Sequence, residues 1–492
     1  MTKTAATTNS NITLAAIKEG SIDAISAGEP AWLVQNRKSA FGKYASLPAE
    51  VSPLYSKYSD ANRIKPEHVH LATTTTAAAA TATTQAAKQG ITGDLAKRLE
   101  ELEKETGILQ LGHETSRVFV KDAVARQGVI VTSIKEAIAR HGDLVKAHME
   151  ANPLDHQEDR YMALEAAAFQ SGVFVYVPRN VVVEEPIRII TSLADDGTSL
   201  VSRNIFVAEA GSKATIVQEL YAPGTGSEAQ QQQQAYFELI EASVKPDAHL
   251  EAVTLQAMGP DTVAVSNRKA FVERDARMSW YVGMFGGMLS RYRTDSVMKG
   301  QGAQAEDIEI VFGAGSQSFD VTSNLIHNGQ HSRGKVQVKS VLKDTSKSLF
   351  KGMIKIGKEG KGTESYLAGH AILLDKGAKS DSIPGLEILT NEVRATHSAS
   401  VAQMDEGQIY YLMTRGLSRE GAKREIVSGF LEPLSRKMGP TIRAWVNYLI
   451  ENKWQGGSLM LRTDEAMEQI LEVEKSRYRE TQDIFEKHYK YR

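Results

Sequence analysis

The sequence predicts a mainly β protein in which a β-solenoid core lies between helical regions. From Gly172 onward, short β-branched segments such as residues 173–177 and 214–217 follow one another for about 200 residues. Strand pairs recur at intervals of roughly 26–36 residues without an intervening helical pattern, which is the spacing of stacked solenoid rungs. An antiparallel sandwich or barrel is the alternative that the same strands allow.

The strand pairs share one feature, a small or acidic turn between their two members. These turns are expected at Gly211, Asp247, Asp275, Gly302, Gly334 and Gly360. Five segments follow from the pattern: an N-terminal helical segment (1–72), a low-complexity Thr/Ala linker (73–90), a helical region (91–170), the parallel β-helix core (171–397) and a C-terminal helical domain (398–492).

Helical spacing of apolar residues supports the outer segments. Trp32, Leu33 and Phe41 fit a helix before the linker, and further helices are expected at 93–106, 133–141, 144–150 and 155–170. After the core, Ser418 is expected to N-cap a helix that Pro433 kinks or divides and that stops at Gly439. Two more helices are expected at 441–452 and 463–490.

Composition limits the function classes. The 492 residues exceed the size of one compact core, and 58 basic against 60 acidic residues give a net charge of −2, which favours neither nucleic acid nor an anionic membrane as partner. No apolar run of about 18 residues and no signal peptide are apparent, so a cytoplasmic protein is expected. The chain contains no cysteine, which excludes disulfides and a thiolate-ligated cluster within it.

Three separated stretches carry a resemblance to a known family. They read SGVFVYVPRNVVVEEPI at 171–187, LLDKGAKSDSIPGLEIL at 373–389 and HSASVAQMDEGQIYYLMTRGLS at 397–418. Together with EPAWLV at 29–34, they make the chain similar to the SufB/SufD family of the SUF iron-sulfur cluster assembly system. The resemblance implies a right-handed parallel β-helix between helical domains, with no enzymatic activity of its own.

Within that family, the resemblance implies a specific role. The scaffold member SufB carries a cysteine near the end of the β-helix and a glutamate directly after a motif histidine, and these positions correspond here to Gly369 and Ser398. Neither replacement supplies a thiolate or a carboxylate, so the chain looks most like SufD, with His397 as its contribution to cluster assembly. Typical SufD sequences have a cysteine at the position of Ala395. Because this chain has alanine there, the departure argues against a second ligand at position 395.

The resemblance also implies partners and cargo. A SufC-type ABC ATPase is expected on the C-terminal helices, at a surface that includes Arg415, Leu417, Ile426, Phe430 and Leu434. The β-helix is expected to pair with a SufB-like subunit or with a second copy of this chain. No cofactor is expected to bind stably to the isolated chain, but His397, placed at a strand-to-helix junction, is a candidate transient ligand for iron or a cluster at the subunit interface.

Other features have simpler readings. His327, His331 and His370 are expected to be structural or solvated, and the apolar run 278–288 to be rung core. The segment GKEGKGTES lacks the spacing of a phosphate-binding loop. Two alternatives stay open: a SufB-like scaffold with non-cysteine ligands, and a β-helical carbohydrate-active enzyme that uses Asp307, Glu309 and Asp320. Flavin binding stays undecided.

Overall fold

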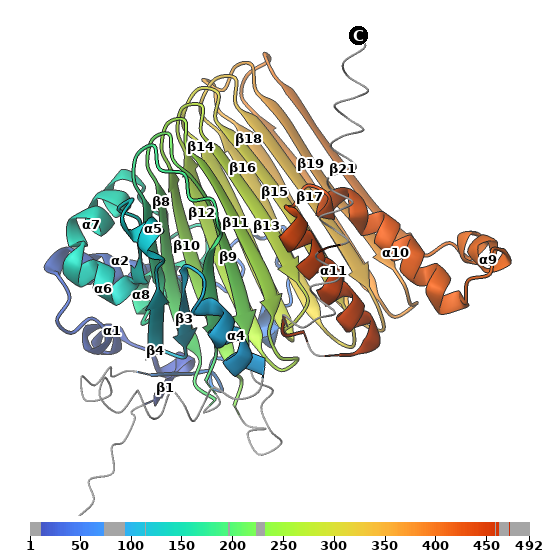
Figure 1. Cartoon of the computed structure of the whole chain (residues 1–492), viewed down its shortest axis with the longest axis horizontal. Coiled ribbons are helices and arrows are strands. Elements are labelled where there is room, and N and C mark those ends of the chain that lie inside the picture. The colour runs from blue at the N-terminus through green and yellow to red at the C-terminus, as the bar shows by residue number, and fades with distance from the viewer. Residues whose placement is uncertain are drawn as a thin grey trace, which may run out of the picture.

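The computed structural model describes residues 11–72, 94–113, 115–194, 197–222, 232–457, 459–461 and 472. Its centre is a β-solenoid in which two long sheets face each other and successive strands alternate between them (Figure 1). The predicted linker at 73–90 and the predicted helix at 463–490 fall outside the described residues, except for Glu472.

The two sheets run in parallel rungs with the order β20-β18-β16-β14-β12-β10-β8-β6-β5 and β21-β19-β17-β15-β13-β11-β9-β7-β3-β4. The strand bounds of the nine-stranded sheet are β5 Ile130–Ser133, β6 Val173–Val177, β8 Leu200–Ala208, β10 Ala235–Val244, β12 Val263–Val272, β14 Leu289–Met298, β16 Ser318–His327, β18 Lys347–Ile356 and β20 Lys379–Ile388. Those of the ten-stranded sheet are β3 Gly107–Leu111, β4 Thr115–Phe119, β7 Ile187–Ser192, β9 Lys213–Tyr221, β11 His249–Ala257, β13 Arg277–Met284, β15 Gln304–Gly313, β17 Arg333–Leu342, β19 Glu364–Leu373 and β21 Arg394–Gln403.

The register confirms the period read from the sequence. From β6 onward, the shortest repeat pairs Val263 with Leu289, 26 residues later, and the longest repeats are 36 residues, as between Leu200 and Tyr236. Because these pairs are parallel, the antiparallel alternative is wrong. One expected turn is also wrong: Gly334 is the second residue of β17, where a side chain would meet the His327 ring, so its glycine serves packing and not a turn.

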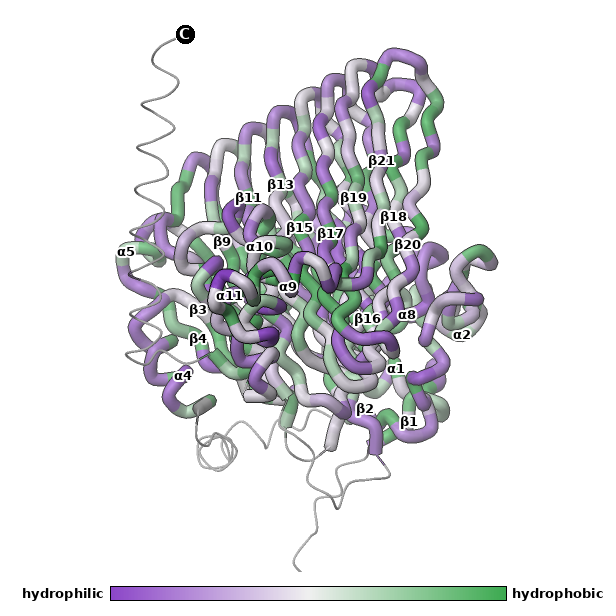
Figure 2. Tube along the Cα trace, turned by 90° about the vertical axis from the view of Figure 1, so that its right-hand side faces the viewer, coloured by the Kyte–Doolittle hydropathy of each residue, from purple (hydrophilic) through white to green (hydrophobic). Residues whose placement is uncertain are grey.

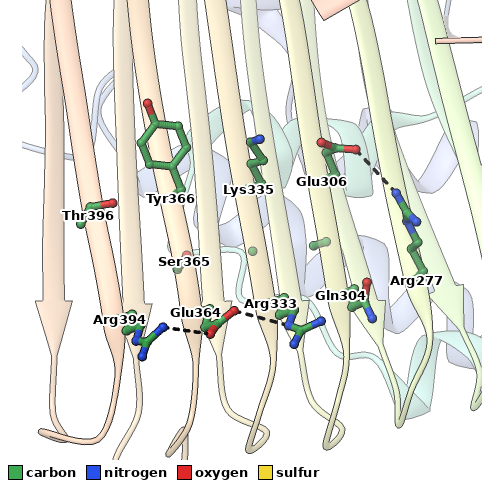
Figure 3. Close-up of a pocket in the computed structure, with 12 residues that line it drawn as sticks. Arg277, Gln304, Glu306, Arg333, Lys335, Glu364, Ser365, Tyr366, Arg394 and Thr396 are labelled. Carbon is green, nitrogen blue, oxygen red and sulfur yellow. Dashed lines mark ion pairs between the residues drawn. The ribbon is translucent and has the colours of Figure 1, made fainter. Parts of the chain in front are cut away.

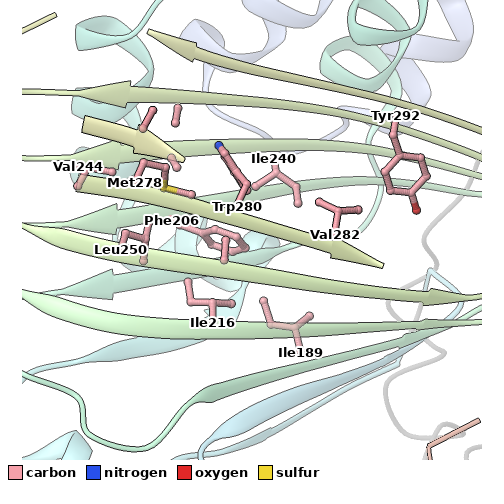
Figure 4. Close-up of a cluster of buried hydrophobic side chains, with 14 of the residues drawn as sticks. Ile189, Phe206, Ile216, Ile240, Val244, Leu250, Met278, Trp280, Val282 and Tyr292 are labelled. Carbon is pink, nitrogen blue, oxygen red and sulfur yellow. The ribbon is translucent and has the colours of Figure 1, made fainter. Parts of the chain in front are cut away.

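The interior of the solenoid is a continuous apolar core. Inward side chains of successive rungs stack on one another, as Leu250 and Met278, which are paired in register, do in Figure 4. The run 278–288 contributes Met278, Trp280 and Val282 to this core, which confirms its expected role. Each rung therefore buries its inner face against its neighbours.

The N-terminal helices cover the outer face of the nine-stranded sheet. They are α1 Glu19–Ile25, α2 Ala31–Ser46, α6 Ile134–Arg140, α7 Gly142–Ala151 and α8 Arg160–Ala168, with the short strand pair β1 Asn11–Thr13 and β2 His70–Ala72 beside them. Arg37 of α2 joins the layers: its guanidinium binds Glu29 at 2.7 Å, donates to the Ala167 carbonyl and lies 3.5 Å from the centre of the Phe169 ring.

Two of the C-terminal helices, α10 Arg419–Ser435 and α11 Pro440–Gln455, cover the opposite sheet, and α9 Glu406–Thr414 projects beside α10 (Figure 1). Val427, Leu431, Trp445 and Leu449 of α10 and α11 pack on outward residues such as Ile308 of β15. In Figure 2 these helices lie in front of the sheet and leave the upper parts of its strands uncovered. Pro433 does not divide α10, which continues to Ser435 because proline removes only one donor near the helix end.

The first rungs contain strands that the helical prediction for 91–170 missed. The expected helices appear as α4 Asp94–Leu102, α6, α7 and α8, with α5 Asp122–Ala125 between them, but β3, β4 and β5 interleave with them. β4 and β5 pair antiparallel with β3 and β6 and end the two sheets at this side. Within the described part of the chain, no helix combines the length and the apolar character that crossing a bilayer requires.

Candidate functional site

The C-terminal end of the solenoid is open. Among the described residues, β20 and β21 have a strand neighbour on one side only, so each presents a ten-residue backbone edge. The side chains of this last rung are also uncovered: Leu386, Ile388 and Val401 are about 40% exposed. Unpaired edges beside exposed apolar residues are typical of a surface that another chain covers.

His397 lies on this open rung. It is the fourth residue of β21 and pairs in register with Leu367 of β19. The junction expected at His397 is therefore wrong, because β21 keeps its parallel pairing with β19 as far as Gln403 and carries the core beyond the predicted boundary at 397. Ala395, on the same face of the strand, packs against the interior core. The imidazole of His397 is accordingly on the inner face and is exposed through the open end.

Gly369 shares the inner face with His397, one strand back. It lies two positions along β19 from Leu367, the residue paired with His397. A Cβ at position 369 would overlap the Phe350 ring, 2.6 Å from its Cε1 atom and closer still to Cδ1, and would lie 3.0 Å from the Ser382 hydroxyl oxygen. The space for a side chain at this position is thus filled by Phe350.

Ser398 points the other way. Successive residues of a strand face opposite sides, so Ser398 lies on the outer face while His397 lies on the inner one. The structure brings together two of the three predicted positions, His397 and Gly369, and separates the third. No group of three or more metal-ligating side chains forms among the described residues, so any metal held near His397 would need ligands from elsewhere.

The other three histidines that the sequence singled out differ in burial and in hydrogen bonding. His327 is fully buried between two hydroxyls, 2.8 Å from Ser332 and 3.0 Å from Ser365, and burial lowers its pKa to about 3. His370 lies on the outer face of β19, 2.7 Å from Ser400. His331 is an exposed turn residue with a φ of 53°. The structural reading of His327 is confirmed.

The predicted ATPase surface is only partly accessible. Ser418 caps α10 as expected, accepting a hydrogen bond from the Gly421 amide at 3.1 Å. Arg415 and Leu417 are exposed, and Ile426 and Phe430 are half-buried. Leu434 is completely buried against the ten-stranded sheet and α11, so it cannot belong to a docking surface.

A stronger apolar surface lies on α9. Tyr410 is 70% exposed, Tyr411 56% and Met413 41%, with Leu417 just beyond the helix. The Arg415 guanidinium lies over the Tyr411 ring, 5.3 Å from its centre. Sequence reasoning treated 397–418 as a motif and missed this patch. The run of apolar and aromatic residues from Ile409 to Met413 was the available signal, because a nine-residue helix with one buried side chain has little core to serve.

The three carboxylates proposed for a carbohydrate-active enzyme do not form one groove. Asp307 and Glu309 are buried inside the solenoid, where desolvation raises the pKa of Asp307 to about 6. Asp320 lies on the outer face of the other sheet and binds Lys351 at 2.7 Å. Acid–base chemistry on a polysaccharide needs both carboxyl groups at the substrate, which buried side chains cannot reach.

Together these features define a class of protein: a β-solenoid with short antiparallel strands at one end, a C-terminal end that exposes His397 among the described residues, and an exposed helical patch on α9. The sequence matches the profile of the SufBD core domain of the SUF iron-sulfur cluster assembly system over residues 190–430, and that of the SufBD N-terminal region over residues 115–189. The chain belongs to the SufBD family.

Relatives agree with this assignment. An iron-sulfur cluster assembly SufBD family protein of Staphylococcus epidermidis is 27% identical over 299 residues, which are 61% of this chain and 63% of the relative. Proteins of the same description from Staphylococcus haemolyticus and Staphylococcus aureus are 26% identical over 330 residues, which are 67% of this chain and 70% of each relative. The chain thus spans slightly less than two thirds of the first of these relatives.

Proposed function

We propose that this chain is a SufD-like, non-catalytic subunit of a cytoplasmic SUF assembly complex. The observation that carries the proposal is position 369, where the family's scaffold member has its cysteine. Here the residue is glycine, the chain has no cysteine at all, and the Phe350 ring occupies the side-chain space. A chain built in this way lacks the nucleophilic sulfur that a scaffold needs.

The open rung is the proposed pairing surface. β20 and β21 would pair with the equivalent edge of a SufB-like subunit or of a second copy, and His397 would then face the junction between the two chains. Iron or a nascent cluster is cargo at that junction, bound transiently by His397 together with ligands of the partner. The isolated chain would hold no cofactor stably.

Charged substitutions at the open rung test the pairing. Val401→Lys places an ammonium on the last rung, which also exposes Leu386 and Ile388 of β20, and should abolish co-purification with the partner subunit and any self-association seen by analytical ultracentrifugation. Val118→Lys is the matched control, because Val118 is also about 40% exposed but lies on β4 at the opposite end of the solenoid. Unchanged association of the Val401→Lys variant would contradict the proposed surface.

The α9 patch is the proposed docking surface for a SufC-type ATPase. Tyr411→Glu should abolish capture of the ATPase by the tagged full-length chain, because the exposed ring makes no core contact that the substitution would disturb. Tyr58→Glu, at a 44% exposed tyrosine of the N-terminal segment, should leave capture unchanged. Equal capture by both variants would place the ATPase elsewhere.

His397 itself is tested in cells that depend on the SUF system. His397→Ala should lower the activity of iron-sulfur enzymes while the complex still assembles, since an exposed side chain contributes little to folding. Normal cluster maturation would remove the histidine from the mechanism. A stable iron-sulfur chromophore on the isolated chain after reconstitution would favour the scaffold alternative.

A further inference from the structure

A row of cationic side chains crosses the outer face of the ten-stranded sheet. In-register pairing places the first residues of β13, β15, β17, β19 and β21 side by side (Figure 3). These residues are Arg277, Gln304, Arg333, Glu364 and Arg394. Adjacent strands lie about 4.8 Å apart, so the three arginines stand two strands, or roughly 10 Å, from one another. The rigid rungs fix this spacing.

A second row lies two residues further along the strands. Glu306, Lys335, Tyr366 and Thr396 occupy the next outward positions, and both rows line one pocket of 550 Å³. Lys437, just after α10, binds Glu306 and brings a further ammonium to the same place. A pocket of this size suits a small molecule better than a folded partner.

The cations of this pocket exceed its acids. The lining contains Arg277, Arg333, Lys335 and Arg394 against two carboxylates, which leaves a net charge of +2 before Lys437 is counted. The guanidinium pairs are loose: Arg333 lies 3.6 Å and Arg394 3.9 Å from the shared Glu364. These distances exceed those of a hydrogen bond, so the donors of both arginines remain available.

The electrostatic environment agrees with an excess of positive charge. Burial and the neighbouring ammonium of Lys437 lower the pKa of Lys335. His249, which continues the first row on β11, has its pKa lowered by burial and then by Arg277 and Lys213. An anion entering the pocket would relieve this repulsion.

We propose that this pocket binds a small polyanion of the diphosphate or triphosphate class. Guanidinium groups bind phosphate oxygens bidentately, and several cations at fixed spacing favour a ligand with more than one phosphate over orthophosphate. Tyr366 lies between the lysine and the edge strand, where its ring offers a surface to a planar group attached to the phosphates. The pocket does not include the α9 patch, but it shares Arg394 and Thr396 with β21, a strand of the proposed pairing edge.

Calorimetric titration of the full chain with pyrophosphate and tripolyphosphate at low salt tests it. Tripolyphosphate should bind with a sub-millimolar Kd, more tightly than pyrophosphate, and orthophosphate should bind at least about tenfold more weakly. Binding should weaken steeply as sodium chloride is added. Failure of tripolyphosphate to saturate the chain by about 10 mM would overturn the proposal.

Two variants assign any binding to the pocket. The double variant Arg333→Gln, Lys335→Gln should raise the Kd for tripolyphosphate at least about tenfold. Lys347→Gln is the matched control, because Lys347 is the exposed first residue of β18 on the opposite sheet and should not alter the Kd. Equal affinity of the double variant and the wild type, or equal losses in the double variant and the control, would overturn the assignment. Tighter binding of an oligoglutamate peptide than of tripolyphosphate would also overturn it.

Discussion

The packing of Phe350 over Gly369 makes a quantitative prediction. Gly369→Ala adds one Cβ that overlaps the ring, 2.6 Å from its Cε1 atom, inside a rung that is otherwise fully paired. Overpacking a closed core by one methyl group costs about 1–3 kcal/mol when side chains have to shift. The substitution should therefore destabilise the last rungs through this steric overlap.

A double-mutant cycle isolates the contact. Phe350→Leu removes ring atoms and should itself cost about 1–2 kcal/mol of the free energy of unfolding. If the ring is the obstacle, Gly369→Ala should cost almost nothing in the Phe350→Leu background. The two substitutions would then be non-additive by about 1–3 kcal/mol, which is well above the scatter of distant pairs.

Hydrogen exchange of the β19 and β21 amides is the appropriate assay, because the end of a solenoid can open without global unfolding. Gly385→Ala on β20 is the control: its new Cβ would meet the terminal methyl of Met353 at 2.6 Å, and this flexible side chain can move away. Additive losses from Gly369→Ala and Phe350→Leu would refute the reasoning. Recovery of stability in the double variant would show that the Phe350 ring has to be replaced before position 369 can carry a side chain such as a thiol.

Two further predictions concern buried polar groups. Because burial lowers the pKa of His327 to about 3 from 6.5, the unfolded chain binds more protons between these values, so stability should fall by about 2 kcal/mol from pH 7 to pH 5. His327→Gln should lose this part of the pH dependence in urea titrations, and an unchanged slope would contradict the assignment. Lys351→Met should cost about 3 kcal/mol because it removes the ammonium that pairs with the buried Asp320 carboxylate, which then keeps only the Ser59 hydroxyl at 3.1 Å and the more distant Arg291. Lys355→Met, which removes an exposed cation from the same strand, should cost under about 1 kcal/mol in the same titrations, and equal losses would contradict this contrast.

The solenoid was predictable because its rungs repeat. Each rung needs apolar residues on alternate positions to stack on its neighbours, and this requirement leaves a periodic trace from Val173 to Leu373. The terminal rungs carry less of that trace. β3 to β5 are four or five residues long and lie among helices, so their alternation is too short to identify.

The position of His397 illustrates a different limit. β21 reads RATHSASVAQ, a polar sequence that resembles a loop more than a core strand. It is a strand because its backbone pairs with β19, and its polarity follows from being the last rung with an exposed inner face. Likewise, no local pattern could reveal that Phe350, 19 residues earlier, fills the space beside Gly369, since that contact exists only when the two sheets face each other.

The two ends of the solenoid differ in a way that links fold to role. At the N-terminal end, antiparallel β4 and β5 end the sheets with short strands, and helices α6 to α8 cover the adjoining face. At the C-terminal end, two full-length strands stop together with apolar side chains exposed. A monomeric solenoid would normally hide such an end beneath a polar cap, because long open edges promote unwanted pairing. Under the proposed pairing, a partner strand would complete the ten-residue edge that each of β20 and β21 leaves open among the described residues, and His397 would lie where the two chains meet.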